Sequence, residues 1–304
     1  MLILLTGGSG HGKSTLARKL LENFPCPRYL VDTALVYDEA EAIQRNKRQG
    51  ALRLQNIETI HQGRDLDYLL VPEGSSAVLE CMCHLTANEM FSCHTMFDPK
   101  QDFRPVFSRI LRGIWHLHHR CENLIIVTNE VSCDGIRYDE STAAYQQMLG
   151  KLNAEIAGFS DCVCEVVCGI PVVLKGTLPN IHPEEESSMS NQILVIGPEN
   201  AGKTEYVRSL GYTDADMSEK LYDDCPVLLN LQKIVLNGIG SLPDVMEQLN
   251  RKKVIVCCEV GSGIIPVSKE LTDARVLTGT ICNALAKNAS GVTRVVCGIP
   301  TTLK

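Results

Sequence analysis

The sequence predicts an α/β protein with mostly parallel sheets, built as two tandem copies of one domain in which the second copy is shortened. Two observations concern local order: an apolar run at residues 2–5 leads into a glycine-rich turn, and residues 193–196 do the same. A helical pattern follows each turn, with Leu16, Leu20 and Leu21 on one face in the first copy. The third observation is that the end of each copy repeats. Strand, turn and helix in this order are typical of domains that bind phosphate groups.

Both glycine-rich turns read G-x-x-x-x-G-K-[ST]. Glycines let the backbone wrap around phosphate oxygens, the lysine reaches the outer phosphates, and the hydroxyl group ligates Mg²⁺. A chance glycine turn is the alternative reading, and two copies in the same context exclude it for the first copy. Duplication would preserve the second motif even after its use was lost. The predicted phosphate-binding residues are Gly7, Gly8, Ser9, Gly10, His11, Gly12, Lys13 and Ser14, and then Gly197, Gly202, Lys203 and Thr204.

The two copies also match at their ends. Residues 166–175 and 295–304 are identical at eight of ten positions, beginning V-V-C-G-I-P. The spacing from Glu130 to Gly169 equals that from Glu259 to Gly298, whereas the second copy is about 60 residues shorter between its lysine and its glutamate. The stretch between the copies carries prolines, glutamates and serines, which is typical of an exposed linker. We therefore expect domains at 1–176 and 191–304, joined by a linker at 177–190.

An acidic side chain that organises Mg²⁺ is expected at the end of a neighbouring buried strand. The run at residues 76–79 leads into Glu80, which fits this role, although a surface acid at a strand end is the plainer alternative. The matching run of the second copy ends in Asn230, which carries no charge, so the second site is expected to bind Mg²⁺ more weakly. No N-K-x-D motif is present, and the choice between ATP and GTP stays open.

Composition excludes several other classes of protein. The formal net charge is −7, which argues against broad contact with nucleic acid, and no apolar run is long enough to span a membrane. Met1 leads into glycine-rich sequence without a basic start, so a cytoplasmic protein is expected. The 14 cysteines are expected to be reduced. Their densest cluster with histidine matches no known zinc spacing; it comprises Cys81, Cys83, His84, Cys93 and His94.

Further motifs in the first copy make a more specific comparison possible. Residues 1–175 resemble the bifunctional adenosylcobinamide kinase and adenosylcobinamide-phosphate guanylyltransferase family of cobalamin biosynthesis. The residues that carry the resemblance, besides the first glycine-rich turn, are Asp38-Glu39, Ile43 with Lys47, Glu58, Leu79-Glu80-Cys81 with Asn88, Val127-Thr128-Asn129-Glu130-Val131, Gly150 with Asn153, and the closing V-V-x-G-I-x-x-x-L-K. The second copy resembles the family only at its two ends.

The resemblance implies a RecA-like P-loop fold, a symmetric oligomer or an intramolecular pseudo-dimer, and nucleotide sites near subunit boundaries. It also implies two reactions. The first phosphorylates the aminopropanol hydroxyl of adenosylcobinamide, and the second transfers GMP from GTP to that phosphate through a guanylylated histidine. By position, Glu80 would support Mg²⁺, and Thr33, Lys47 and Glu58 would lie in the nucleotide pocket.

One departure from the family concerns that histidine. It is expected on the helix after Asp38-Glu39, where this chain reads Ile43-Gln44-Arg45-Asn46-Lys47. Arginine stays charged and asparagine is a poor nucleophile, so neither forms the phosphoramidate intermediate. His61 is the nearest substitute in sequence, with a plain surface residue as the alternative. Guanylyl transfer is therefore the doubtful half of the predicted function.

The shortened copy lacks the histidine helix and the Glu58 motif. We expect it to be a degenerate partner that packs as a neighbouring subunit would. The leading prediction is a nucleotide-dependent transferase in which Lys13, Ser14 and Glu80 support the kinase step. A non-catalytic, nucleotide-binding regulatory or structural protein is the alternative, and a kinase acting on another small alcohol is a third reading.

Overall fold

The computed structural model describes residues 1–35, 52, 55–91, 101–180, 190–264, 266 and 268–304. Contacts group the chain into two compact units. The first unit comprises Met1–Thr6, Lys13–Glu165 and Val173–Ile181, and the second comprises Gly7–Gly12, Val166–Val172 and His182–Lys304. Each unit is described by itself below. The proposed linker at 177–190 falls mostly outside the described residues, and the second sheet begins at Ser190.

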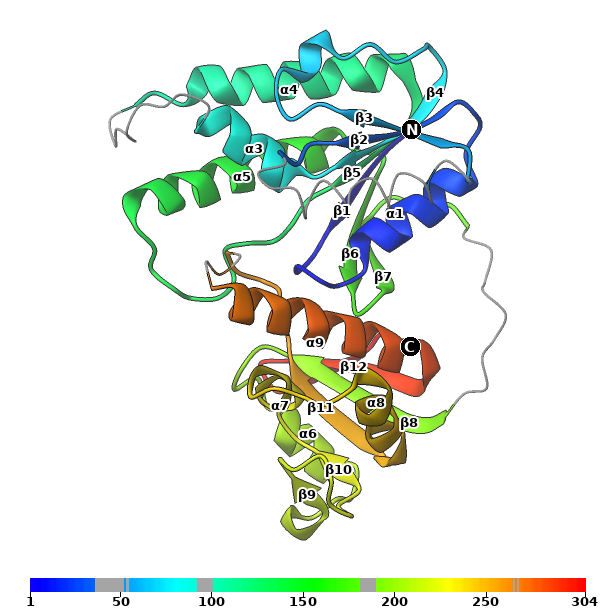
Figure 1. Cartoon of the computed structure of the whole chain (residues 1–304), viewed down its shortest axis with the longest axis vertical. Coiled ribbons are helices and arrows are strands. Elements are labelled where there is room, and N and C mark those ends of the chain that lie inside the picture. The colour runs from blue at the N-terminus through cyan, green and yellow to red at the C-terminus, as the bar shows by residue number, and fades with distance from the viewer. Residues whose placement is uncertain (36–51, 53–54, 92–100, 181–189, 265, 267) are drawn as a thin grey trace. The chain divides into compact units, whose positions relative to one another are not determined.

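Among the described residues, the first sheet has seven strands in the order β3-β2-β4-β5-β1-β6-β7. Five of its pairs are parallel, namely β3–β2, β2–β4, β4–β5, β5–β1 and β1–β6 (Figure 1). Its elements in chain order are β1 (Leu2–Thr6), α1 (Lys13–Glu22), β2 (Arg28–Asp32), β3 (Ile57–His61), the short helix η1 (Leu66–Tyr68), β4 (Ser75–Glu80), α3 (Met82–Met90), α4 (Arg104–Arg120), β5 (Cys121–Val127), α5 (Glu140–Phe159), β6 (Cys162–Val167) and β7 (Ile170–Lys175).

In the described part of the second unit, the sheet has six strands in the order β13-β12-β8-β11-β10-β9. The pairs are parallel except β12–β13, which is antiparallel. Its elements are β8 (Ser190–Gly197), α6 (Lys203–Ser209), η2 (Asp214–Asp216), β9 (Met217–Ser218), β10 (Val227–Leu228), α7 (Leu231–Leu236), α8 (Leu242–Arg251), β11 (Val254–Cys258), α9 (Lys269–Asn288), β12 (Ala289–Val296) and β13 (Ile299–Thr302).

The two strand orders are the same once β3 is removed from the first. β8 takes the place of β1, β11 that of β5, β10 that of β4, and β9 that of β2. The shortening predicted from sequence therefore corresponds to the loss of one edge strand and the contraction of its neighbours. The predicted α/β class, with two mostly parallel sheets from repeated sequence, is confirmed.

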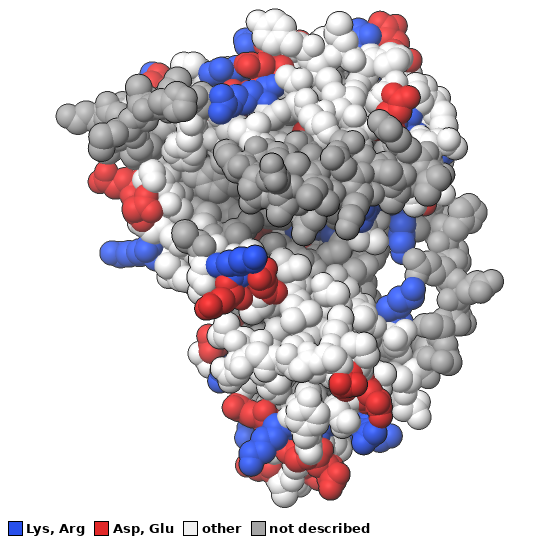
Figure 2. All heavy atoms as spheres, viewed as in Figure 1, with Lys and Arg blue, Asp and Glu red and all other residues white. Residues whose placement is uncertain are grey.

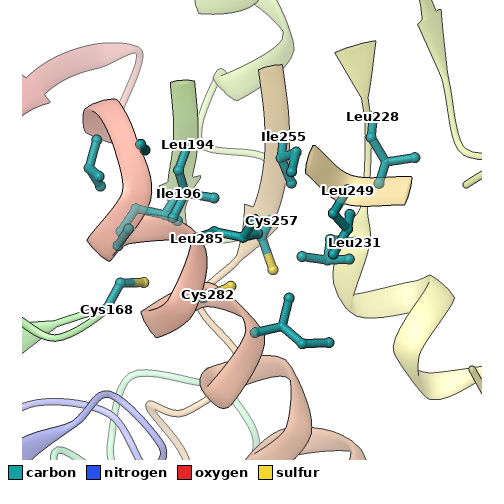
Figure 3. Packing of buried hydrophobic residues seen from close by; sticks show 14 of the residues in the cluster. Cys168, Leu194, Ile196, Leu228, Leu231, Leu249, Ile255, Cys257, Cys282 and Leu285 are labelled. Atoms are coloured by element: carbon teal, nitrogen blue, oxygen red, sulfur yellow. The ribbon is translucent and has the colours of Figure 1, made fainter. Parts of the chain in front are cut away.

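Continuous apolar runs form the central strands because these strands are covered on both faces. Leu2, Ile3, Leu4 and Leu5 of β1 are at most 2% exposed. In the second unit, β8, β11 and α9 share one core that includes Leu194, Ile196, Ile255, Leu285 and the thiols of Cys168, Cys257 and Cys282 (Figure 3). The thiols act there as small apolar groups.

Charged side chains are mixed rather than segregated on the face of the molecule seen in Figure 2, where basic and acidic groups lie in small adjoining clusters. Within the described part of the chain, no helix has the length and apolar character that a membrane-spanning helix requires. All 13 cysteines among the described residues are free thiols.

Candidate functional site

The first glycine-rich loop follows β1 and ends where α1 begins at Lys13. Gly7 has a φ of +126°, and a Cβ atom there would lie 2.6 Å from the carbonyl oxygen of Val166. Left-handed backbone recurs at Gly10 and Gly12, with φ of +80° and +90°. These conformations turn the chain sharply between strand and helix, and only glycine fits at Gly7 without displacing the neighbouring strand.

Each glycine-rich loop is held by the hairpin turn that closes its own copy. The N–H of Gly169 donates to the carbonyl oxygen of His11 at 2.9 Å, and the N–H of Gly298 donates to that of Ala201 at the same distance. Sequence reasoning missed this role, although its signal was present. In both copies it is the glycine of the repeated C-G dipeptide that donates this hydrogen bond to the loop backbone.

Lys13 is buried, with only 5% of its surface exposed. Burial lowers the pKa of its ammonium group from 10.5 to about 8, while the neighbouring Cys83, Cys81 and Glu80 act in the opposite direction. The amine therefore lies close to the carboxylate predicted to support Mg²⁺. A buried ammonium group beside a phosphate loop gains most from a ligand that brings negative charge.

Glu80 is the last residue of β4, in register with Asp32 of β2 and Val127 of β5. Thr33 fixes the backbone at this strand end. Its N–H donates to the Glu80 carbonyl at 2.9 Å, its hydroxyl donates to the Cys81 carbonyl at 2.8 Å, and the Cys81 N–H donates back to the hydroxyl at 2.8 Å. Thr33 is fully buried. Thr33 thus lies beside Glu80, and its hydroxyl is hydrogen-bonded to the backbone of Cys81.

Two thiols and a histidine lie directly after Glu80. The Sγ of Cys81 is 3.6 Å from Nδ1 of His84. A hydrogen bond with Cys83 and the contact with His84 hold the pKa of Cys81 well below its usual range. The hydrogen bond with Cys81 and burial raise the pKa of Cys83. The pKa of His84 is raised, mainly by Cys81. This start of α3 therefore holds a polarised thiol pair beside Glu80.

The other predicted pocket residues are not gathered at the same place. Glu58 lies near the start of β3, opposite Tyr29, and its side chain is exposed. The strand register instead places His61, the last residue of β3, in line with Asp32 and Glu80. The Nδ1 of His61 is 3.4 Å from Oδ2 of Asp32. Lys47 and the helix expected to carry the family histidine lie outside the described residues.

The second glycine-rich loop has the same backbone pattern. Gly197 and Gly202 have φ of +152° and +90°, and Asn200 repeats the left-handed conformation of Gly10. The ammonium group of Lys203 donates to the carbonyl oxygen of Gly197 at 3.2 Å and to that of Pro198. Thr204 follows at the start of α6. The loop is thus formed, with its lysine turned onto its own backbone.

The strand end that would supply a metal ligand differs in this copy. The amide of Asn230 donates to Glu219 at 2.5 Å and accepts a hydrogen bond from Gln232 at 3.2 Å. Glu259, which directly follows β11, forms a two-point ion pair with Arg294, at 3.1 and 3.2 Å, and its side chain is 4% exposed. The side-chain oxygens of Asn230 and Glu259 are therefore bonded to other side chains of the protein. A Mg²⁺ site would need such oxygens as ligands for the ion.

The described residues contain no group of three or more histidine, cysteine, aspartate or glutamate side chains placed to hold a metal ion, and Cys93 and His94 lie outside them. Ser14 and Glu80 offer a hydroxyl and a carboxylate, which are the oxygen ligands Mg²⁺ prefers when phosphates complete its coordination. These two residues fit such an ion.

Strand, glycine-rich loop, helix and an acid at a nearby strand end define a P-loop domain of the nucleotide-binding class. The model of the cobinamide kinase / cobinamide phosphate guanyltransferase family matches residues 3–174 and 213–303, and the chain belongs to this family. The two matched segments agree with the predicted tandem repeat.

Two curated relatives are similar to this chain. The bifunctional adenosylcobalamin biosynthesis protein CobU of Salmonella typhimurium is 28% identical over 183 residues, which are 58% of this chain and 100% of the relative. The protein of the same name from Escherichia coli is 27% identical over the same lengths. The family predicted from sequence is confirmed, and it supports an enzyme of cobalamin biosynthesis over a non-catalytic homologue.

Proposed function

We propose that this chain is a cytoplasmic enzyme that transfers a phosphoryl group from a nucleoside triphosphate to the hydroxyl of adenosylcobinamide. The observation that carries the proposal is the buried ammonium group of Lys13 at the end of a formed phosphate loop, beside the carboxylate of Glu80. Membership of the cobinamide kinase family supplies the substrate class.

The chemistry asks mainly for positioning and for neutralisation of charge. The loop at residues 7–14 would hold the triphosphate through backbone N–H groups other than that of Ser9, which donates to another carbonyl group. Lys13 would bind the outer phosphates as negative charge moves toward the leaving oxygen. Ser14 and Glu80 would hold Mg²⁺, which supplies further neutralisation when bound. Thr33 keeps Glu80 in place through the two hydrogen bonds it makes to Cys81.

The kinase step is tested by following label from γ-³²P-ATP and γ-³²P-GTP to adenosylcobinamide. The wild-type protein is expected to label the corrinoid in the presence of Mg²⁺, and a Lys13→Ala variant to lose at least about a hundredfold in rate. Unchanged labelling by Lys13→Ala would refute the proposal. Comparison of the two nucleotides also decides the base preference.

Guanylyl transfer is proposed as absent or strongly reduced. The expected position of the nucleophile reads Arg45-Asn46, and neither side chain can carry a phosphoramidate. His61 is the candidate for a substitute nucleophile, because it is the last residue of β3, pairs in register with Asp32 and contacts the Asp32 carboxylate. Incubation with α-³²P-GTP tests both statements, because a stable GMP–protein adduct would contradict the first and its loss in His61→Asn would support the second.

We also propose that the second loop, through Gly197, Gly202, Lys203 and Thr204, binds a nucleotide weakly and without an acidic metal ligand. The repeated backbone conformation supports this, and the pairing of Asn230 and Glu259 with other side chains accounts for the missing ligand. Calorimetric titration would separate one site from two. Partner copies of the same chain, as in a homo-oligomer, are proposed by analogy with the family.

A further inference from the structure

The first phosphate loop is bound by residues from the far end of the chain. The N–H of Ser9 donates to the carbonyl oxygen of Gly261 at 2.8 Å, and the side-chain amide of Asn283 donates to the carbonyl oxygen of Gly10 at 2.9 Å. Gly261 lies in the loop after β11, and Asn283 lies on α9. All four residues belong to the second compact unit, which includes Gly7–Gly12.

The backbones approach so closely here that side chains are excluded. A Cβ atom at Gly279 of α9 would lie 2.7 Å from the carbonyl oxygen of Gly10, and one at Gly261 would clash with that of Ser9. The matching helix position in the first copy is Gly150, and a Cβ atom there would meet nothing within 4 Å. Both helices carry a glycine at this position, but only the glycine of α9 lies this close to another backbone.

These bonds fix the orientation of two peptide planes in the loop. In a trans peptide the N–H points away from the preceding carbonyl, so the bond from Asn283 to the Gly10 oxygen also directs the N–H of His11. That N–H faces into the loop, where it donates to the Gly8 carbonyl at 3.3 Å. Because these two peptide planes are already fixed in the free protein, less backbone conformational entropy is lost when the loop binds a phosphate group.

We propose that Asn283 and Gly279 are positioning residues for the first phosphate loop, so that the backbone conformation of residues 7–12, and with it nucleotide binding, depends on α9. The proposal rests on the function proposed for that loop. The shortened copy would then support nucleotide binding without catalysing a reaction itself. Gly279 permits the approach of α9, and Asn283 then holds the Gly10 carbonyl.

The test uses the full chain and measures the Kd for ATP and for GTP by calorimetry. Asn283→Leu removes the donor at similar size, and its Kd is expected to rise about three- to tenfold, as for the loss of one ordinary hydrogen bond. Asn283→Gln keeps an amide and is expected to stay within about twofold of wild type. Gly279→Ala is expected to weaken binding at least as much as Asn283→Leu, whereas the matched Gly150→Ala is expected to leave it unchanged.

Two further measurements separate positioning from general damage. Without nucleotide, the unfolding midpoint followed by circular dichroism is expected to fall by only about 2–4 °C in Asn283→Leu, as for the loss of one hydrogen bond, with a single cooperative transition as in wild type. Hydrogen exchange of the wild-type protein is expected to show a protected Ser9 amide, and this measurement needs no variant to fold. A rapidly exchanging Ser9 amide would overturn the proposal.

The outcomes also distinguish this proposal from the proposed function. If wild type binds nucleotide, Lys13→Ala does not, and Asn283→Leu and Gly279→Ala both bind as wild type does, the role of α9 is refuted and the function stands. If wild type binds neither ATP nor GTP, the proposed function fails first. Equal weakening by Gly150→Ala and Gly279→Ala would refute the specific contact.

Discussion

The ammonium group of Lys13 is expected to destabilise the protein when no nucleotide is bound. The group is 5% exposed, and its burial lowers its pKa from 10.5 to about 8. A lowered pKa for a lysine means that the folded state disfavours the charged form. Replacing Lys13 with methionine, which has a similar length and no charge, should therefore stabilise the empty protein while it abolishes nucleotide binding.

The size of the effect follows from the shift of the pKa. A fall from 10.5 to about 8 corresponds to about 3 kcal/mol at pH 7, since one pKa unit is worth about 1.4 kcal/mol. The unfolded state binds more protons than the folded state between pH 8 and pH 10.5, so wild-type stability rises with pH across this window. Above the window, the amine is neutral in both states. The advantage of Lys13→Met is thus largest at pH 7 and disappears above about pH 10.5.

The chain contains one tryptophan, Trp115 on α4, whose ring stacks on Phe159 with centroids 4.4 Å apart. Its fluorescence therefore reports the unfolding of the unit that contains Lys13. Urea titrations of wild type, Lys13→Met and the charge-retaining Lys13→Arg at pH 7 and at pH 9.5 give the comparison. Lower stability of Lys13→Met at pH 7, or a gain that does not shrink at the higher pH, would refute the reasoning.

Four further predictions follow from the strand ends and the second loop. Glu80→Gln is expected to reduce Mg²⁺-dependent phosphoryl transfer by about a hundredfold while nucleotide still binds in EDTA, as checked by calorimetry. His61→Asn is expected to leave the kinase rate unchanged in the label-transfer assay. Lys203→Ala is expected to lower nucleotide stoichiometry without changing that rate. Arg294→Met leaves the buried Glu259 carboxylate without its two-point partner and is expected to cost about 3 kcal/mol, most of which the double variant with Glu259→Gln regains in chemical unfolding.

The fold could be predicted from sequence because its signals are local. Each phosphate loop shows its apolar strand, its glycines and the start of its helix within about 20 residues. The repeat then fixes the number of copies. Glu80 was placed correctly at a strand end for the same reason, because the buried run before it is continuous.

The arrangement of the pocket could not be predicted because it depends on strand register. A shift of three residues along β3 decides whether Glu58 or His61 reaches the edge of the sheet beside Asp32. Likewise, the hydrogen bond from Gly169 to His11 joins parts of the chain far apart in sequence. Sequence showed that the C-G dipeptide was repeated, but only the structure shows which backbone it binds.

The matching strand orders of the two sheets show where this architecture tolerates loss. Among the described strands, β3 pairs with β2 alone, so its loss breaks one set of hydrogen bonds. In the second copy, β9 then forms the edge with two residues. A central strand such as β5 or β11 has neighbours on both sides, and removing it would divide the sheet. Sheets of this kind are therefore expected to shorten in evolution from the outer margin inward, and the phosphate loop survives because it follows a central strand.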